Sequence, residues 1–334
     1  MNYIGSKFKL SNWIKKEIHS VVGKDLSNKV FADLFAGTGA VSRTLKKDVS
    51  QVIANDLEKY SYILNRNYIG NYQIIDSTSE IIDELNNLPL EDGFIFKNYC
   101  LGGGQGRQYF KDNNGRKIDA IRNAINKFMT NKEITEDCYY FLLASLLESA
   151  DKVANTASVY GAFLKQIKKS AEKDLILEPA NFDLTENAHQ VFQKDANKLI
   201  KEISGDILYL DPPYNSRQYG ANYHLLNTIA EYDSFMPKGK TGLREYLKSK
   251  YCSKVMVEQE FEALIRQANF KYIFLSYNNE GLMSESKIRQ IFSQYGKYDL
   301  VTTGYQRFKA DRTENRNYKA SSTTEYLHIL EKNE

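Results

Sequence analysis

Short apolar runs recur along the chain, and each is bounded by polar or turn residues. They occupy residues 30–32, 52–54, 207–210 and 272–275. Their length and their content of β-branched and aromatic residues favour buried strands. Helical periodicity separates them, as in residues 40–45 after the first run. Strands that alternate with helices predict an α/β fold with a parallel sheet.

This alternation breaks down between residues 74 and 188. A connection of this length cannot be a plain loop inside a compact domain, so we expect an insertion with its own structure. Apolar residues recur at helical spacing in residues 118–128 and 139–147, which predicts a mainly helical body. We therefore expect a catalytic domain formed by residues 1–73 and 189–334, with residues 74–188 inserted into it.

A basic stretch in the insertion surrounds a predicted turn. Residues 113–115 are Asn-Asn-Gly, which supply the left-handed positions that a hairpin needs. Basic side chains interleaved with Gln, Asn, Tyr and Gly suit contacts with phosphates and base edges. A glycine-rich solvated loop is an equally good interpretation, because charged stretches usually face solvent. The candidate phosphate and base contacts here are Lys97, Arg107, Gln108, Lys111, Arg116 and Lys117, and a second basic loop, residues 307–319, adds Arg307, Lys309 and Arg312.

Composition and charge narrow the class of protein. The 334 residues carry a formal net charge of +3, which is too small to establish a polyanionic partner. Three widely spaced cysteines without a Cys-x-x-Cys pair, and only four histidines, predict no metal site. No apolar run approaches the roughly 20 residues that span a bilayer, and the first residues lack the apolar run of a signal peptide. We expect a cytoplasmic protein without a membrane partner.

The strongest chemical signal follows the apolar run at residues 207–210. The run stops at Asp211, Pro212, Pro213 and Tyr214, because proline cannot continue a central strand. An open α/β sheet binds its ligands at the carboxyl ends of its strands. A carboxylate, a proline carbonyl and an aromatic ring at such an end predict a site for a flat ring that carries an amine.

A second signal follows the first apolar run, where the chain enters a turn with Gly37 and Gly39 before a helix. Glycines let the backbone approach a ligand closely, and the helix start presents free N–H groups. Two glycines, where the dinucleotide fingerprint has three, argue against pyrophosphate binding. Asp56 ends the next strand, 17 residues beyond Gly39, and is placed to accept hydrogen bonds from a ribose diol. A plain βαβ unit with a capping aspartate is the alternative.

The motifs at residues 35–39 and 211–214, separated by a long insertion, resemble the adenine-N6 DNA methyltransferases of the Dam-like (D12) class. The resemblance implies a Rossmann-like methyltransferase sheet, mostly parallel with the last strand antiparallel, and a helical target-recognition insertion. It also implies S-adenosylmethionine as the cofactor, S-adenosylhomocysteine as the product, and no metal. The residues that match the family's cofactor contacts are Tyr3, Lys7, Phe35, Gly37, Gly39, Asp56 and Asp195.

The resemblance also implies roles for the catalytic residues. The amine of adenine is a weak nucleophile, because its lone pair is delocalised into the ring. Asp211 and the Pro212 carbonyl would accept hydrogen bonds from the two hydrogens of this amine and so localise its lone pair. Tyr214 would stack on the base. A target base inside a duplex must first be flipped out of the stack.

Double-stranded DNA is then the expected partner, and a monomeric type II modification enzyme of a bacterial or phage-like system is the expected kind of protein. We expect a short palindromic target such as CATG, which a cognate restriction endonuclease would cut. Three alternatives stay open: a methyltransferase acting on RNA or on a protein glutamine, a catalytically silent DNA-binding subunit, and a strand that simply ends in a proline turn. Intact Asp211, Tyr214 and Asp56 argue against the silent subunit.

Overall fold

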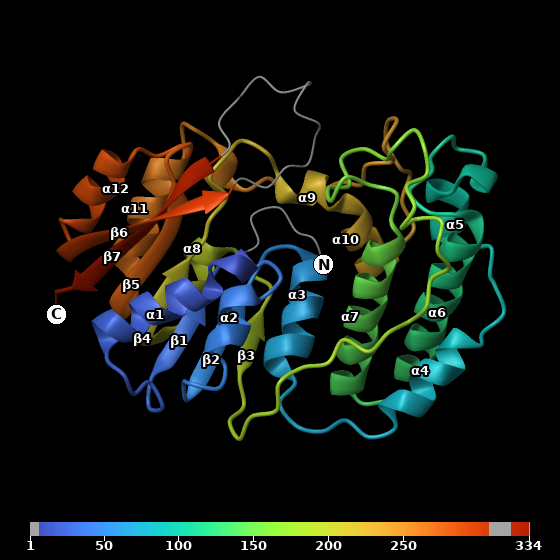
Figure 1. Ribbon diagram of the computed structural model, residues 1–334, viewed down its shortest axis with the longest axis horizontal. Helices are drawn as coiled ribbons and strands as arrows, with labels where there is room; N and C mark the ends of the chain where they lie inside the picture. The colour runs from blue at the N-terminus through green and yellow to red at the C-terminus, as the bar shows by residue number, and fades with distance from the viewer. Residues whose placement is uncertain (1–6, 307–321, 334) are drawn as a thin grey trace. The chain divides into compact units, whose positions relative to one another are not determined.

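A computed structural model describes residues 7–306 and 322–333 of the chain (Figure 1). The chain forms two compact units. The first, here called the sheet unit, contains the described residues of 5–57, 187–218 and 248–334. The second, the helical unit, contains residues 58–186 and 219–247.

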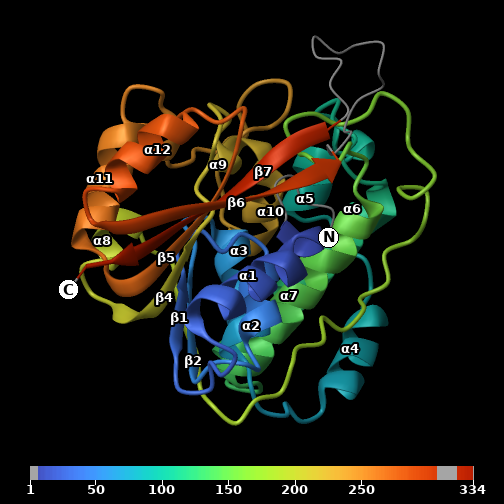
Figure 2. The same cartoon turned by 60° about the vertical axis from the view of Figure 1, so that its left-hand side comes forward.

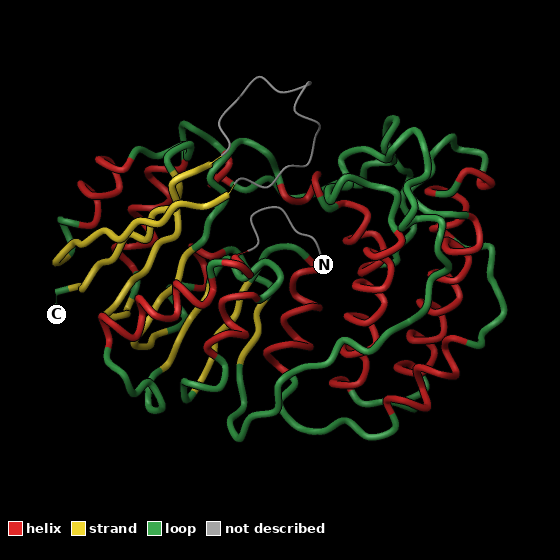
Figure 3. The backbone as a smooth tube through the Cα atoms, viewed as in Figure 1, coloured by secondary structure: helices red, strands yellow, loops and turns green. Residues whose placement is uncertain are grey.

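The sheet unit is built on one sheet, whose strands are yellow in Figure 3. The sheet has seven strands in the order β3-β2-β1-β4-β5-β7-β6. Neighbours from β3 to β5 are parallel, whereas β7 runs antiparallel to both β5 and β6. This confirms the expected Rossmann-like sheet with an antiparallel last strand. The strands are β1 (Val30–Asp33), β2 (Gln51–Asn55), β3 (Gln190–Phe192), β4 (Ser204–Leu210), β5 (Asn269–Asn278), β6 (Gly296–Gln306) and β7 (Ser322–Lys332).

Helices cover both faces of this sheet, with α1 and α2 on one face and α8, α11 and α12 on the other (Figure 2). On the second face Leu199, Phe261 and Ile288 pack against Leu208 and Ile273 in one buried apolar cluster. Coverage on both faces explains why the central strands are continuous apolar runs. The helices are η1 (Lys7–Lys9), α1 (Ser11–Val22), α2 (Ala40–Leu45), α8 (Ala196–Leu199), η4 (Lys250–Cys252), α11 (Val257–Gln267) and α12 (Glu285–Phe292).

Strand register brings the carboxyl ends of the central strands to one edge. Asp33, the last residue of β1, pairs with Tyr209 of β4. Leu210, the last residue of β4, pairs with Leu275 of β5. The residues that follow β1, β2 and β4 therefore lie along one edge of the sheet, where open α/β sheets bind their ligands.

The helical unit has a buried apolar core of its own. Its two longest helices, α6 and α7, contain the helical segments predicted at residues 118–128 and 139–147, which confirms both. The elements are α3 (Lys59–Asn65), the π-helical turn η2 (Arg66–Gly70), α4 (Thr78–Asn86), α5 (Phe94–Tyr99), η3 (Leu101–Gly103), α6 (Asp112–Thr130), α7 (Glu136–Val153), α9 (Tyr219–Asn222) and α10 (His224–Glu231).

The hairpin predicted around residues 113–115 is wrong, because these residues form the first turn of α6. Tertiary contacts decide the conformation there. The side-chain amide of Asn114 donates to the Lys173 carbonyl at 2.9 Å and its oxygen accepts from the Leu175 N–H at 2.9 Å. A Cβ added to Gly115 would lie 2.2 Å from Cys100 Sγ. This glycine therefore permits close packing of a helix and does not make a turn.

The division into units differs from the expected domain boundaries in two segments. Residues 58–73 and 219–247 belong to the helical unit, although we expected both in the catalytic domain. Their apolar side chains explain the difference, since Tyr60 of α3 and Leu225 and Leu226 of α10 are buried in the core of the helical unit.

Candidate active site

The catalytic candidates stand at the end of β4, where Asp211 and Pro212 follow Leu210 directly. Pro212 is buried, and the Asp211 side chain is 15% exposed. The two prolines lack backbone N–H groups, so the parallel ladder of β4 stops here. The acid thus stands at the carboxyl edge of the sheet.

A buried lysine joins this acid to a second carboxylate. Lys7 Nζ lies 3.1 Å from Asp211 Oδ1 and 2.8 Å from Glu325 Oε1. Lys7 comes from η1, and Glu325 lies on β7 opposite Asn278 of β5. All three side chains are largely removed from solvent. A buried charge needs a partner, and here one cation serves two carboxylates, so the cluster carries one net negative charge when all three groups are ionised.

Burial and neighbouring charges shift the proton affinities of this cluster. Burial, opposed by Lys7 and reinforced by Glu325, raises the pKa of Asp211 to about 6. Burial alone lowers the pKa of Lys7, but the charges of Asp211 and Glu325 outweigh it and raise that pKa well above its ordinary value. At neutral pH Asp211 is therefore mainly a carboxylate, which can only accept hydrogen bonds.

The Tyr214 ring is held beside this cluster. Lys7 Nζ lies 5.6 Å from the ring centroid, and the Tyr277 ring contacts it edge-on at 6.3 Å between centroids. The Tyr214 carbonyl accepts a hydrogen bond from the Leu282 N–H at 3.0 Å. Because Tyr214 is only partly buried, its ring keeps accessible surface on which a base could stack.

The glycine turn after β1 is tied to the acid after β2. The Gly37 N–H donates to Asp56 Oδ2 at 2.8 Å, so the structure brings these two predicted cofactor residues together. Gly37 and Gly39 have φ angles of +54° and +75°. These left-handed conformations favour glycine, and they let the backbone come close to a ligand at the start of α2.

Two further cofactor candidates, Phe35 and Asp195, lie near α8. The Phe35 ring contacts Tyr251 edge-on at 5.0 Å, and the Tyr251 hydroxyl donates to Asn197 of α8 at 2.7 Å. Asp195 caps the same helix, because its side chain accepts from the Lys198 N–H at 3.1 Å. Asp195 is exposed and Phe35 is half-buried, so both can present surface to a ligand.

Two carboxylates at this edge of the sheet, Asp33 and Glu325, are not among the site residues predicted from the sequence. Asp33 ends β1 and accepts from the Ser42 hydroxyl at 2.9 Å. Burial raises its pKa to about 8, and the charge of Asp211 contributes. An acid at the end of a buried apolar run was a usable signal for Asp33. No local signal marks Glu325, because its burial results from the pairing of β7 with β5.

The side chains of the predicted DNA contacts Arg107 and Gln108 form hydrogen bonds with backbone carbonyls inside the helical unit. Arg107 is buried, and its guanidinium donates to the carbonyls of Asn98, Gly239 and Lys240 at 3.0 to 3.3 Å. The Gln108 side chain donates to the carbonyls of Leu164 and Lys165. These bonds fix loops of the protein, so the geometry favours a supporting role for both residues over direct contact with DNA.

Three of the other basic candidates in the insertion are partly exposed and have partners of their own. Lys111 pairs with Asp174 at 3.2 Å, Arg116 pairs with Asp92 at 2.6 Å, and Lys117 donates to the Asn86 carbonyl. Lys97 is exposed and has no ion pair within the described ranges. Exposed ion pairs are weak, so a phosphate could replace these carboxylates. Outside the described residues lie Tyr3, Arg307, Lys309 and Arg312.

In the part of the chain that the structure describes, no group of three or more His, Cys, Asp or Glu side chains could hold a metal ion. Over the same residues, no helix is both long and apolar enough to cross a membrane.

The parallel sheet with its antiparallel last strand, the glycine turn bound to an acid, and the Asp-Pro-Pro-Tyr edge together define a Rossmann-like methyltransferase. Comparison with known proteins gives the family. Residues 3–291 match the model of the D12 class N6 adenine-specific DNA methyltransferases. The chain belongs to this family.

Curated relatives agree with this assignment. The chain is 68% identical to the type II methyltransferase M.NlaIII of Neisseria lactamica, over 99% of each chain. It is 40% identical to the type II methyltransferase M.CviAII of Paramecium bursaria Chlorella virus 1, over 93% of each chain. It is also 38% identical to the type II methyltransferase M.FokI of Planomicrobium okeanokoites, over 99% of this chain and 53% of that longer protein.

Proposed function

We propose that this protein transfers a methyl group from S-adenosylmethionine to N6 of an adenine flipped out of a short site in duplex DNA. The observation that carries the proposal is the buried Lys7 ammonium shared by Asp211 and Glu325 at the carboxyl edge of the sheet. It holds Asp211 in a fixed place as a hydrogen-bond acceptor, next to the partly exposed ring of Tyr214.

The residues at the glycine turn fit the cofactor. Gly37 and Gly39 leave the backbone open to close approach, and Asp56, which accepts from the Gly37 N–H, would accept hydrogen bonds from a ribose. When bound, S-adenosylmethionine supplies a methyl group that its positively charged sulfur makes electrophilic. Phe35 and Asp195 would contact the adenosine part, and Lys7 and Tyr3 would contribute from the N-terminal segment.

The chain's own catalytic task is to orient the target amine. Asp211 and the Pro212 carbonyl would accept hydrogen bonds from the two N6–H groups, which localises the nitrogen lone pair and orients it for methyl transfer. Methyl transfer to N6 would leave S-adenosylhomocysteine, and the proton that N6 loses would pass to water. Pro213 maintains the turn that exposes these acceptors. Tyr214 stacking would return about 1–3 kcal/mol of the cost of base flipping.

Transfer of a radiolabelled methyl group to duplex DNA tests the proposal. Asp211→Ala should lower transfer by at least about a hundredfold, because a preorganised acceptor is lost. Its affinity for S-adenosylmethionine, measured by calorimetry, should stay unchanged. The exposed carboxylate of Asp299 on β6 offers a control, since Asp299→Ala should keep full activity. Transfer to RNA alone, or to no nucleic acid, would contradict the proposal.

A protective role in a restriction-modification system follows from this activity and from the names of the relatives. We expect a monomer that methylates a short palindrome such as CATG and so blocks a cognate endonuclease, which acts on the same site and need not bind the methyltransferase. Sequencing of modified bases in DNA from bacterial cells that express the protein would identify the site. Gel filtration with light scattering would give the oligomeric state.

A further inference from the structure

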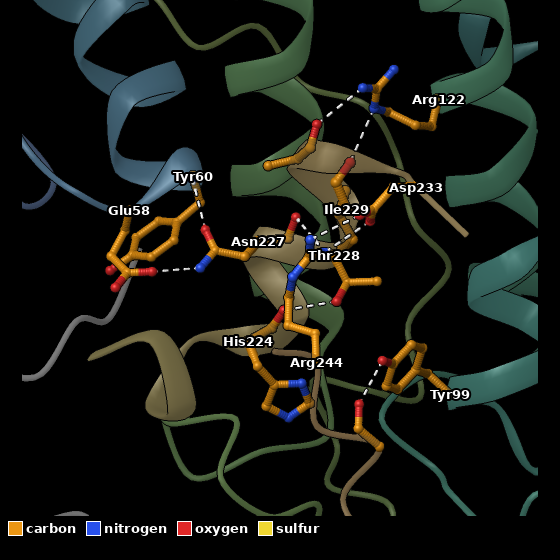
Figure 4. A network of polar contacts seen from close by, with 12 residues as sticks. Glu58, Tyr60, Tyr99, Arg122, His224, Asn227, Thr228, Ile229, Asp233 and Arg244 are labelled. Atoms are coloured by element: carbon orange, nitrogen blue, oxygen red, sulfur yellow. Dashed lines mark hydrogen bonds and ion pairs between the residues drawn. The ribbon is translucent and has the colours of Figure 1, made fainter. Parts of the chain in front are cut away.

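A short hairpin loop in the helical unit has an unusually well-supported backbone. Residues 238–243, here called the 238–243 loop, close with two hydrogen bonds between Lys238 and Leu243, at 2.8 and 2.9 Å. Gly239 and Gly242 have φ angles of +66° and +72°, which favour glycine at both positions. After the loop, Arg244 binds both carboxylate oxygens of Asp233, at 3.0 and 3.1 Å, and fixes its return end (Figure 4).

Four successive carbonyls of this loop accept hydrogen bonds from buried side chains of residues 99–109. Arg107 donates to the carbonyls of residues 239 and 240, at 3.0 and 3.3 Å. The Tyr109 hydroxyl donates to the carbonyl of residue 241 at 3.1 Å. The Tyr99 hydroxyl donates to the carbonyl of residue 242 at 2.7 Å (Figure 4). Both tyrosines are fully buried, and Arg107 is 7% exposed.

This arrangement determines what the loop shows to solvent. In a trans peptide the C=O and N–H point in opposite directions. Because the carbonyls of Gly239 and Lys240 point inward, the N–H groups of Lys240 and Thr241 point outward. Neither N–H has a backbone acceptor in the described part of the chain. Lys240 is exposed and forms no ion pair there, whereas Lys238 is paired with Glu245 at 2.6 Å.

We propose that the 238–243 loop binds a backbone phosphate of duplex DNA through the N–H groups of Lys240 and Thr241 and the Lys240 ammonium. Successive outward N–H groups form an anion-binding concavity, and a neighbouring cation adds charge. Such groups read no base edges, so the loop positions the duplex without selecting its sequence. Arg107, Tyr99 and Tyr109 are positioning residues that hold the loop in its binding conformation before DNA arrives. The inference rests on the proposed function.

Lys240→Ala is the direct test, because the exposed side chain can be removed without disturbing the fold. Its duplex affinity, measured by fluorescence anisotropy in 0.1 M salt, should fall about fivefold to tenfold. The loss should be equal for duplexes of different sequence, and the slope of log K against log salt should decrease by about one. Lys240→Arg should restore both quantities. Lys127→Ala, at an exposed lysine in the last turn of α6 that has no ion pair with any described residue, should change neither.

Tyr99→Phe tests the support of the loop, because it removes only the hydroxyl that holds the Gly242 carbonyl. We expect Tyr99→Phe to weaken DNA binding, although Tyr99 is fully buried. Lys240→Ala should then reduce the DNA affinity of the Tyr99→Phe variant by a smaller factor than it reduces that of the wild type. Such non-additivity shows that both changes act through one contact. Additive losses would contradict a positioning role for Tyr99.

The outcomes separate this inference from the proposed function. Duplex binding and methylation by the wild type, together with unaltered affinity and salt slope in Lys240→Ala, would overturn the loop assignment alone. Failure of the wild type to bind or methylate any duplex would overturn both.

Discussion

At the scale of single residues, the active site depends on how one buried lysine is shared. Lys7 lies closer to Glu325, at 2.8 Å, than to Asp211, at 3.1 Å. Glu325 therefore competes with Asp211 for the only cation within ion-pair distance of either acid among the described residues. Its charge works against ionisation of Asp211, which in the proposed mechanism must be a carboxylate to accept hydrogen bonds from the substrate amine.

Glu325→Gln should move the acid limb of the pH–rate profile to lower pH. Asp211, whose pKa is about 6, loses its acceptor form as the pH falls through that value. Removal of the Glu325 charge lowers this pKa and leaves Lys7 entirely to Asp211. Single-turnover methylation between pH 5 and 8 measures the midpoint. A purely structural role for Glu325 would reduce the rate at every pH without moving the midpoint.

Asp33→Asn should flatten the pH dependence of stability. Burial raises the pKa of Asp33 to about 8, so in the folded protein it remains protonated well above its ordinary pKa. This group's contribution is fully present below its unfolded pKa of about 4 and is lost as the pH rises toward 8, with a slope of at most about 1.4 kcal/mol per pH unit. Urea unfolding at pH 5, 6, 7 and 8 measures the effect. An unchanged slope in the variant would contradict it.

At the scale of elements, the start of α6 shows how packing overrides local turn chemistry. Residues 113–115 have the composition of a hairpin turn, yet they are helical. Asn114 binds the backbone of residues 173 and 175, and Gly115 lies against Cys100. The element is therefore fixed by segments distant in sequence.

Gly115→Ala should destabilise the protein by about 1–3 kcal/mol, although alanine is the better helix former. Its Cβ would lie 2.2 Å from Cys100 Sγ and 3.2 Å from Phe96 Cα. Urea unfolding gives the free energy. In a Cys100→Ala background, Gly115→Ala should cost less stability than it does in the wild type, because the Cys100 sulfur is the atom nearest to the added Cβ. No recovery would place the strain elsewhere.

At the scale of the whole molecule, the two proposals assign separable tasks to the two units. The sheet unit contains Asp211 and the glycine turn, whereas the 238–243 loop belongs to the helical unit. Binding of the cofactor and of the DNA backbone should therefore respond to different substitutions.

Gly39→Ala should weaken the binding of S-adenosylmethionine while duplex binding, measured without cofactor, stays unchanged. Its φ of +75° disfavours any residue with a Cβ by about 1–2 kcal/mol, so alanine would shift the free turn to another conformation, and cofactor binding would have to restore this one. The expected loss of affinity by calorimetry is about fivefold to thirtyfold. Lys240→Ala should show the opposite pattern. Equal losses of both affinities in either variant would contradict separable tasks.

The sequence by itself determined the central strands of the sheet and the residues that directly follow them. The buried runs of β1, β2, β4 and β5 are visible from local periodicity, and Asp211 and Asp56 directly follow two of them. Such predictions succeed because they need only covalent neighbours: a strand end and the residue after it are fixed together.

Only the tertiary structure decided which side chains meet. Glu325 reaches Lys7 because β7 inserts between β5 and β6, and Arg107 is buried because it supports a loop more than 130 residues away. The helical core also takes in α3 and α10 from outside the expected insertion. Long-range pairing and burial determine these contacts, and local periodicity carries no information about them.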